Sequence, residues 1–277
     1  MEKPSLFICG AVRNCEPYLD IAFENIERIA TLFSDAHIIM AFDESDDHTL
    51  LKLTQRKKKY GDKMDILINK DPLSHIRTER IANARNRLLA KMRELPERPY
   101  FIMMDMDDAC SFETNLEPIE HALNQSSEWD SISFNRPNYY DLWALSLDPY
   151  IYSCWGWTDP WNVVDIMREY VSKRLKELKP GELLECRSAF NGLAIYKTDP
   201  FLKCKYDWRM PKQYMSLEDL RKNCEVLGNR RSNSPFDQFT DESDCEHRSF
   251  HMEAIAKYGA RIRISPECIF DQLFVHF

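Results

Sequence analysis

The sequence predicts an α/β domain with a mostly parallel central sheet and helices on both faces. Short apolar runs typical of strands alternate with longer segments in which apolar residues recur every three or four positions. This alternation indicates parallel strands joined by helical crossovers. The clearest strand is the apolar run 100–104, which stops abruptly at three closely spaced carboxylates, Asp105, Asp107 and Asp108.

Each element follows from its local pattern. Apolar runs predict strands at Leu6–Cys9, Ile38–Phe42, Ile66–Ile68, Phe101–Met104, Ser131–Phe134, Leu193–Tyr196 and Ile262–Ile264. Helical spacing predicts helices at Tyr18–Phe33, Thr49–Tyr60, Thr78–Leu95, Val163–Leu178 and from Asp244, as the N-cap, to Tyr258. Beyond about residue 135 the regular alternation gives way to aromatic loops. No linker or repeat divides the chain, so we expect one domain over residues 1–277.

Composition narrows the functional class. The 277 residues are 44% hydrophobic and 30% charged, as in an ordinary soluble protein. The net charge of −8 argues against a nucleic-acid partner. No apolar segment is long enough to span a membrane, and the N-terminus lacks a signal-peptide pattern. The nine scattered cysteines contain no CxxC pair, so we expect reduced thiols and a soluble, cytoplasmic protein.

The acidic residues after the strand at 101–104 are the first candidate site. An isolated charge is costly to bury, so the strand should leave the sheet at Asp105. Ligands bind at this carboxyl end in open α/β sheets. Carboxylates clustered there repel one another unless a cation joins them, and Asp105 and Asp107 suit Mg²⁺ or Mn²⁺ shared with substrate phosphates. A solvated acidic turn is the alternative interpretation.

Other charged residues follow neighbouring strands. Arg13 follows the first strand and could meet a phosphate or base, although the surrounding turn is not a dinucleotide-binding motif. Asp43 and Glu44 follow the second strand, where a carboxylate suits hydrogen bonding to a ribose or base. Arg80 lies near the start of the helix at 78–95 and could complement a diphosphate. A solvated basic face is the alternative for this helix.

The second half of the chain supplies candidates for sugar binding and catalysis. Aromatic residues crowd the segment 138–161, and their faces suit sugar rings, although core packing explains several equally well. Gly192, one of only seven glycines, would allow close approach of a substrate to the backbone. Near the C-terminus, Asp244 or Glu246 could act as a general base. His247 or His251 could complete the coordination shell of a metal.

Taken in order, these segments resemble a GT-A type glycosyltransferase, whose hallmark is a DxD motif after an apolar strand. Asp105-Met106-Asp107 matches that motif. More narrowly, the chain is similar to the capsule-associated and cryptococcal α-1,3-mannosyltransferase-like group. The matching segments are Arg13-Asn14, Phe42 to Thr49, Arg80 to Asn86, Phe134 to Trp143, Phe190 to Tyr196 and Cys245-Glu246-His247. Members of that group are usually membrane-tethered, whereas this chain shows no anchor, as would suit a soluble microbial or large-virus enzyme.

The resemblance implies a single GT-A-like, Rossmann-like domain and a role for each matching residue. Residues 1–135 would bind a UDP- or GDP-sugar, and residues 136–277 would bind the acceptor, a glycan or protein-linked sugar. Asp107 would ligate Mn²⁺ or Mg²⁺, and Asp105 would contact the ribose of the donor or reach the metal through water. His247 or His251 would be a further metal ligand. The donor would also contact Arg13, Asp43, Glu44 and Arg80. Glu246, or less favourably Asp244, would be the catalytic base of an inverting enzyme, or would stabilise positive charge on the sugar in a retaining one.

The resemblance further implies that Tyr140, Trp143, Asn191 and Gly192 contact the sugar or acceptor. The transferred group would be a hexose or a pentose. Two other functions compete with this interpretation. A haloacid-dehalogenase-like phosphatase also places a DxD motif after a strand, but this chain has Ala109 where that family normally has Thr or Val. A non-catalytic module that binds a nucleotide-sugar or carbohydrate is the third interpretation.

Overall fold

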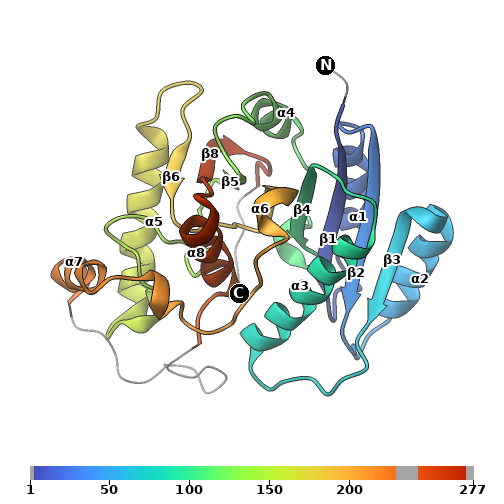
Figure 1. Ribbon diagram of the computed structural model, residues 1–277, viewed down its shortest axis with the longest axis horizontal. Coiled ribbons are helices and arrows are strands. Elements are labelled where there is room, and N and C mark those ends of the chain that lie inside the picture. Colours follow the sequence, from blue (N-terminus) through green and yellow to red (C-terminus); the bar gives the residue numbers. More distant parts are fainter. Residues whose placement is uncertain (1–2, 229–242, 273–277) are drawn as a thin grey trace.

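The computed structural model describes residues 3–228 and 243–272 (Figure 1). Within these residues eight strands form one sheet in the order β3-β2-β1-β4-β7-β5-β8-β6. Strands β6 and β7 run opposite to the others, so the predicted mostly parallel α/β sheet is confirmed. The strands are β1 (Ser5–Val12), β2 (Asp35–Phe42), β3 (Met64–Ile68), β4 (Tyr100–Asp105), β5 (Ser131–Asn135), β6 (Leu184–Cys186), β7 (Leu193–Lys197) and β8 (Ile262–Cys268).

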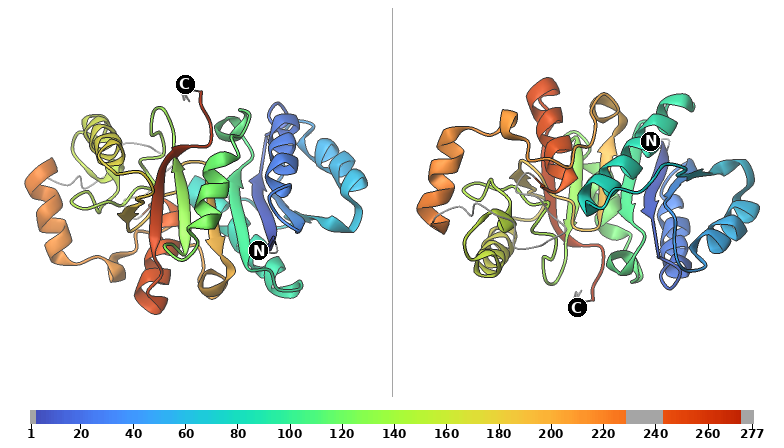
Figure 2. Two further views of the ribbon diagram at one scale, coloured as in Figure 1. Left: turned by 90° about the horizontal axis from the view of Figure 1, so that it is seen from above. Right: turned by 90° about the horizontal axis from the view of Figure 1, so that it is seen from below.

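Helices cover both faces of the sheet, as predicted (Figure 2). The core on one face includes α3, α5 and α8, whereas the core on the other includes α1, α2 and α4. The α-helices are α1 (Leu19–Ala30), α2 (Thr49–Tyr60), α3 (Arg77–Glu94), α4 (Glu117–Asn124), α5 (Pro160–Lys176), α6 (Thr198–Phe201), α7 (Leu217–Leu227) and α8 (Glu246–Tyr258). Short 3₁₀ helices are η1 (Gly61–Lys63), η2 (Asp108–Cys110), η3 (Cys154–Gly156) and η4 (Lys212–Tyr214).

The continuous apolar run of β4 is explained by burial on both faces. Phe101 and Met103 belong to the core beneath α3, whereas Ile102 and Met104 belong to the core beneath α1. Neighbouring residues of a strand point to opposite faces, so a strand that is covered on both sides needs apolar residues at every position. The run ends at Asp105, where β4 reaches the edge of the sheet and the side chain is only partly buried, with 26% of its surface exposed.

The strand order places a natural binding position at the carboxyl end of β1. This strand pairs in parallel with β2 on one side and with β4 on the other. From β1 the chain passes to β2 and β3 on one side and returns through α3 to β4 on the other. The strand order therefore reverses at β1, and open α/β sheets bind ligands at such a switch point. None of the helices in the described ranges is long and apolar enough to cross a membrane.

Local patterns missed several elements of the second half. Strand β6 has only three residues, too few for a recognisable apolar run, and forms through its pairing with β8. Helix α7 was not predicted, although Ser216 and Asp219 form a capping box. The prediction that Asp244 caps α8 was wrong, because the N-cap is Cys245. The Asp244 side chain instead accepts hydrogen bonds from the Cys245 backbone N–H and from Arg248.

Candidate active site

The carboxyl ends of β1, β2 and β4 and the first turns of α3 enclose a cavity of about 210 Å³. Its lining contains residues predicted from four separate segments of the sequence: Arg13, Asp43, Arg80, Asp105 and Asp107. The position agrees with the switch point of the sheet. A second cavity of about 450 Å³ shares Asp43 and Arg80 with the first and continues along α3 to the loop 69–74. The two cavities together offer room for a ligand larger than a phosphate group.

Packing beneath the DxD segment turns both of its carboxylates away from the core. Met106, the middle residue, is 1% exposed. A Cβ atom added at Gly10 would lie only 2.5 Å from Met106 Cγ, so glycine is needed on β1 for this close approach. The backbone N–H of Asp105 donates to Gly192 O at 2.8 Å, which ties the end of β4 to the start of β7. The Asp107 carboxylate accepts the N–H of Ala109 at 3.1 Å and thereby starts η2.

The two aspartates are electrostatically strained. Burial, reinforced by the negative charge of Asp107, raises the pKa of Asp105 from 3.8 to about 8. Burial also raises the pKa of Asp107, and repulsion from Asp108 adds to the effect. Closely spaced carboxylates with raised pKa values gain most from a bound cation, since it removes their mutual repulsion.

The donor set at Asp105 and Asp107 fits a hard divalent cation. Mg²⁺ and Mn²⁺ prefer oxygen ligands, and Mg²⁺ is commonly held by one or two carboxylates together with phosphate oxygens and water. Among residues 3–228 and 243–272, no group of three His, Cys, Asp or Glu side chains could hold a metal ion by itself. The arrangement therefore suits a cation that is shared with a phosphate-bearing ligand.

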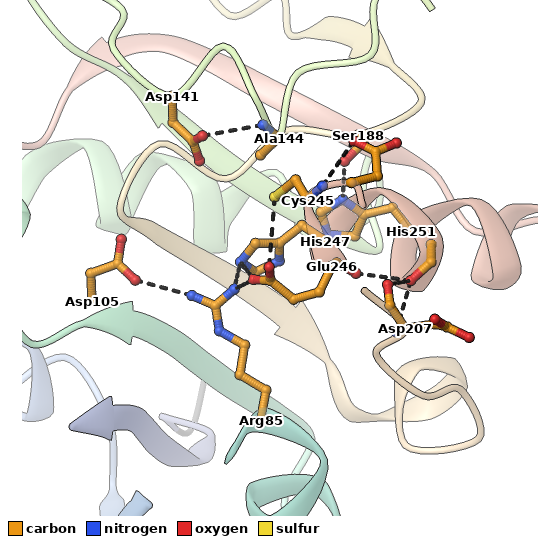
Figure 3. A network of polar contacts seen from close by, with 12 residues as sticks. Arg85, Asp105, Asp141, Ala144, Ser188, Asp207, Cys245, Glu246, His247 and His251 are labelled. Atoms are coloured by element: carbon orange, nitrogen blue, oxygen red, sulfur yellow. Dashed lines mark hydrogen bonds and ion pairs between the residues drawn. The ribbon is translucent and has the colours of Figure 1, made fainter. Parts of the chain in front are cut away.

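Arg85 is the main site residue that the sequence did not single out. Its side chain is 5% exposed and extends from α3 between two carboxylates (Figure 3). Nη2 lies 3.0 Å from Asp105 Oδ1, and Nη1 forms an ion pair with Glu246 Oε1. The guanidinium carbon also lies 4.8 Å from the ring centre of Phe190. The helical pattern of α3 places Arg85 beside the buried Ala84 and Leu88, which was a signal that this arginine faces inward.

Glu246 and Asp244, the two candidate bases, have different surroundings. Glu246 begins α8, is 3% exposed, and reaches Arg85 at the edge of the cavity. A carboxylate in the first turn of a helix is favoured by the helix dipole. Asp244 is fully buried and pairs with Arg248 at 2.8 Å. Arg248 in turn donates to the carbonyl groups of Leu145 and Ile151, so this second pair anchors the aromatic loop.

His247 and His251 lie behind Glu246, in the interior. Burial, with the positive charge of Arg85, lowers the pKa of His247 well below its usual range, so the ring is neutral and its Nε2 faces the guanidinium. Both nitrogens of His251 meet hydroxyl groups, Nδ1 that of Ser188 at 2.9 Å and Nε2 that of Tyr196 at 3.0 Å. A cation at His247 would have to displace Arg85. The geometry therefore favours the two aspartates over the two histidines as metal ligands.

Among four predicted donor-binding residues, Arg13, Asp43 and Arg80 line the cavity, and Glu44 does not. Arg80 is half-buried and donates to Ser74 O at 2.7 Å. Asp43 is 6% exposed and pairs with Arg87 at 2.6 Å. Arg13 is exposed, and its Nε donates to Glu44 O at 3.1 Å. Glu44 is itself exposed and does not line the cavity of about 210 Å³.

Tyr140 is the predicted sugar-binding residue that reaches the acidic cluster. Its hydroxyl donates to Asp105 Oδ2 at 3.4 Å, and Arg136 lies against its ring at 5.1 Å from the centre. Trp143 is partly buried and packs against the core on the α3 face. Four aromatic residues of the same segment are buried, as the core-packing alternative anticipated: Tyr139, Tyr150, Tyr152 and Trp157. Trp161 is the contrasting case, with 62% of its surface exposed.

Asn191 and Gly192 shape the backbone beneath this site. Asn191 has a φ of +59°, and its side chain donates to Phe134 O at 2.9 Å while accepting from the backbone of Tyr140 and Asp141. Gly192 has a φ of +93°, and an added Cβ would lie 3.0 Å from both Arg136 and Tyr140. These contacts give both residues a role in shaping the backbone beneath the site, and their contact with a sugar or acceptor stays a prediction.

No family model and no curated protein matches the chain. Several solved structures are similar over most of its length. Residues 1–349 of S. aureus TarS are 12% identical, with 98% of this chain and 59% of that chain covered and a TM-score of 0.43. A mannosyltransferase from Pyrobaculum calidifontis, in complex with GDP-Man and Mn²⁺, is 13% identical, with 97% and 56% covered and a TM-score of 0.46.

A third similar structure is the M. tuberculosis glucosyl-3-phosphoglycerate synthase, with 11% identity, 81% of this chain and 67% of that chain covered, and a TM-score of 0.42. The chain thus spans 59% and 56% of the lengths of the TarS fragment and the mannosyltransferase. Similarity of this degree leaves the activity to be inferred from the site.

Proposed function

We propose that this protein is a metal-dependent glycosyltransferase that moves a sugar from a UDP- or GDP-sugar to a hydroxyl group of an acceptor. One observation carries the proposal. A single cavity at the switch point of the sheet gathers the acidic pair Asp105 and Asp107 with the cations Arg13 and Arg80, and Glu246 stands at its edge through Arg85. Acids for a cation, arginines for a diphosphate and a separate carboxylate for a hydroxyl proton are the parts that sugar transfer from such a donor requires.

Residues 1–135 would bind the donor. Asp105 and Asp107 would hold Mn²⁺ or Mg²⁺, which when bound neutralises the charge that develops on the leaving diphosphate. Arg13 and Arg80 would place positive charge beside the same phosphates. Asp43, at the junction of the two cavities, would accept a hydrogen bond from the ribose or base, with Glu44 at the exposed rim.

Residues 136–277 would bind the acceptor and supply the catalytic carboxylate. In an inverting enzyme Glu246 would take the proton of the acceptor hydroxyl as the new glycosidic bond forms and the bond to the diphosphate breaks. In a retaining enzyme it would stabilise positive charge on the sugar. Tyr140 reaches Asp105 and would border the transferred sugar, whether a hexose or a pentose. The acceptor would be a glycan or a protein-linked sugar.

The narrower proposal is membership of the capsule-associated and cryptococcal α-1,3-mannosyltransferase-like group, as a cytoplasmic enzyme. The support is the placement of its matching segments. Arg13, the segment after β2, the start of α3 and the DxD motif all line one cavity. Cys245-Glu246-His247 opens α8 against Arg85, at the edge of the same site.

A thermal-shift panel tests the proposal. UDP, GDP and their common sugar conjugates would each be added with Mn²⁺ and with EDTA. A ligand that binds only the native state raises the melting temperature by mass action. We expect one nucleotide family to raise it in the presence of Mn²⁺ and to lose that effect in EDTA. No shift with any of them would contradict the proposal, and hydrolysis of a simple phosphate ester that is lost in Asp105→Asn would instead favour the phosphatase.

A further inference from the structure

Arg85 lies between two carboxylates to which the proposed function assigns separate roles. Its guanidinium connects Asp105, at the end of β4, with Glu246, at the start of α8 (Figure 3). The two carboxylates belong to the two halves of the chain, 141 residues apart as the difference of their numbers, 246 − 105. Arg85 is therefore a side chain through which the donor side of the site contacts the catalytic carboxylate proposed for the acceptor side.

Both oxygens of Asp105 are engaged in this structure. Oδ1 accepts from Arg85 at 3.0 Å, and Oδ2 accepts from Tyr140 at 3.4 Å. A cation that binds Asp105 must therefore compete with these donors. Asp107 has a different environment, because the contact to its Oδ1 is the backbone N–H of Ala109. Of the two aspartates, it is therefore Asp105 for which a cation and the Arg85 guanidinium would compete.

A buried guanidinium released by one carboxylate needs another partner nearby. Leaving a buried charge unpaired is strongly unfavourable, since its desolvation is no longer compensated. Arg85 already holds that second partner in Glu246, and it also stacks against Phe190 and lies 5.8 Å from the ring centre of Tyr206. The aromatic rings would keep the guanidinium in place when a cation binds one of its two carboxylate partners.

We propose that Arg85 is a positioning residue that is shared between Asp105 and Glu246, and that filling the donor site shifts it toward Glu246. This inference rests on the proposed function, because it assigns a cation to Asp105. With the donor site filled, Arg85 would pair with Glu246 alone and would hold that carboxylate in place for the acceptor hydroxyl.

The test is the affinity for Mn²⁺ alone, measured from the electron paramagnetic resonance signal of the free ion. Arg85→Gln removes the competitor, so we expect it to bind Mn²⁺ about five- to tenfold more tightly than wild type. Glu246→Gln leaves Arg85 with Asp105 as its remaining carboxylate, so it should bind Mn²⁺ more weakly by a similar factor. In the double variant the second substitution should change the affinity by less than about twofold.

Two matched variants control for the change of charge alone. Arg77→Gln removes an exposed positive charge from the same cavity, and Glu253→Gln removes a buried carboxylate from the same helix as Glu246. We expect Glu253→Gln to change Mn²⁺ affinity by less than about twofold, because Glu253 lies two turns from the site. Arg77→Gln should tighten Mn²⁺ binding by less than Arg85→Gln does, because the exposed Arg77 acts on Asp107 across solvent that screens its charge. Circular dichroism and melting temperatures establish that each variant is folded.

The possible outcomes separate this inference from the proposed function. A folded Arg85→Gln variant that binds Mn²⁺ no more tightly than Arg77→Gln would overturn the inference while leaving sugar transfer by the wild type intact. If Arg85→Gln does not fold, the comparison of Glu246→Gln with Glu253→Gln decides, and equal affinities would overturn it. Failure of the wild type to bind Mn²⁺ or to transfer sugar would overturn the proposed function and the inference with it.

Discussion

Asp105 and Asp130 lie at opposite ends of the same sheet and have opposite surroundings. Asp105 ends β4, and Asp130 immediately precedes β5, which runs in the same direction. Asp130 accepts from Lys197 Nζ at 3.0 Å, from Arg261 Nε at 3.0 Å and from the Arg261 backbone at 2.9 Å. These partners outweigh the effect of its burial and hold its pKa at about 2, whereas the pKa of Asp105 is raised to about 8.

The difference shows how one residue type serves stability at one end of the sheet and ligand binding at the other. At the amino end of β5, donors from Lys197 and Arg261 satisfy one carboxylate, and the charge contributes to folding. At the carboxyl end of β4, burial and neighbouring negative charges raise the pKa values of Asp105 and Asp107, an electrostatic cost that a bound cation can relieve. Groups with strongly perturbed pKa values in a cavity are candidates for function.

Among the substitutions that test this comparison, Asp107→Ala should have the largest effect. We expect it to weaken Mn²⁺-dependent nucleotide binding by at least about 100-fold and to abolish transfer, because it removes one of two proposed cation ligands. Titration calorimetry with Mn²⁺ and the nucleotide found in the thermal-shift panel measures the loss. Asp108→Ala is the matched control, since it removes the neighbouring carboxylate. Full activity of Asp107→Ala in EDTA would remove the metal from the proposal.

Glu246→Gln separates catalysis from donor binding. Loss of a general base reduces the rate by about 10²- to 10⁴-fold, while nucleotide affinity should change only by the few-fold effect transmitted through Arg85. Single-turnover transfer and calorimetry on the same preparation measure the two quantities. Glu253→Gln should retain the wild-type rate. Normal turnover in Glu246→Gln would assign the base to another residue.

Asp244→Asn should act on stability instead. It breaks a fully buried pair with Arg248, and the loss of one partner from such a pair costs about 3–5 kcal/mol of unfolding free energy. Denaturant unfolding measures this cost. A folded variant with wild-type stability and no transfer would mean that Asp244, and not Glu246, is the base.

Asp130→Asn tests the contribution of the other carboxylate, at the amino end of β5, to stability. We expect a loss of about 2 kcal/mol at neutral pH from weakened charge-assisted hydrogen bonds, with nucleotide binding unchanged. Because the pKa is lowered from 3.8 to about 2, the wild-type contribution is present above pH 3.8 and is lost as the pH falls toward 2. Unfolding curves between pH 2 and pH 7 would therefore converge for the two proteins at the acid end.

The pH dependence of Asp105 should have the opposite sign. Its pKa is raised from 3.8 to about 8, so the metal-free native state binds a proton more tightly than the unfolded chain does. Asp105 should therefore lower stability progressively as the pH rises from 3.8 to about 8. Asp105→Asn should flatten this part of the stability curve in EDTA. An unchanged curve would show that Asp105 is not the strained group.

Local sequence patterns identified the strands of the first half of the fold, its helices other than α4, and its ligand-binding edge. All predicted strands are present. Strands that are buried on both faces need apolar residues at consecutive positions, and such runs are visible in the sequence. The abrupt end of the apolar run at Asp105 marked the point where β4 leaves the core. The later half was harder to predict, since β6 and α7 depend on pairing and packing with distant segments.

Only the tertiary structure decided how the charges pair. Arg85 and Glu246 are 161 residues apart in sequence, and nothing local to either residue predicts their contact. The same holds for Asp244, whose burial with Arg248 gives it a structural partner, and for His251, whose two nitrogens meet Ser188 and Tyr196. The physical reason is that periodicity and solvation act along a few residues, whereas the partner of a buried charge is selected by the packing of whole elements against one another.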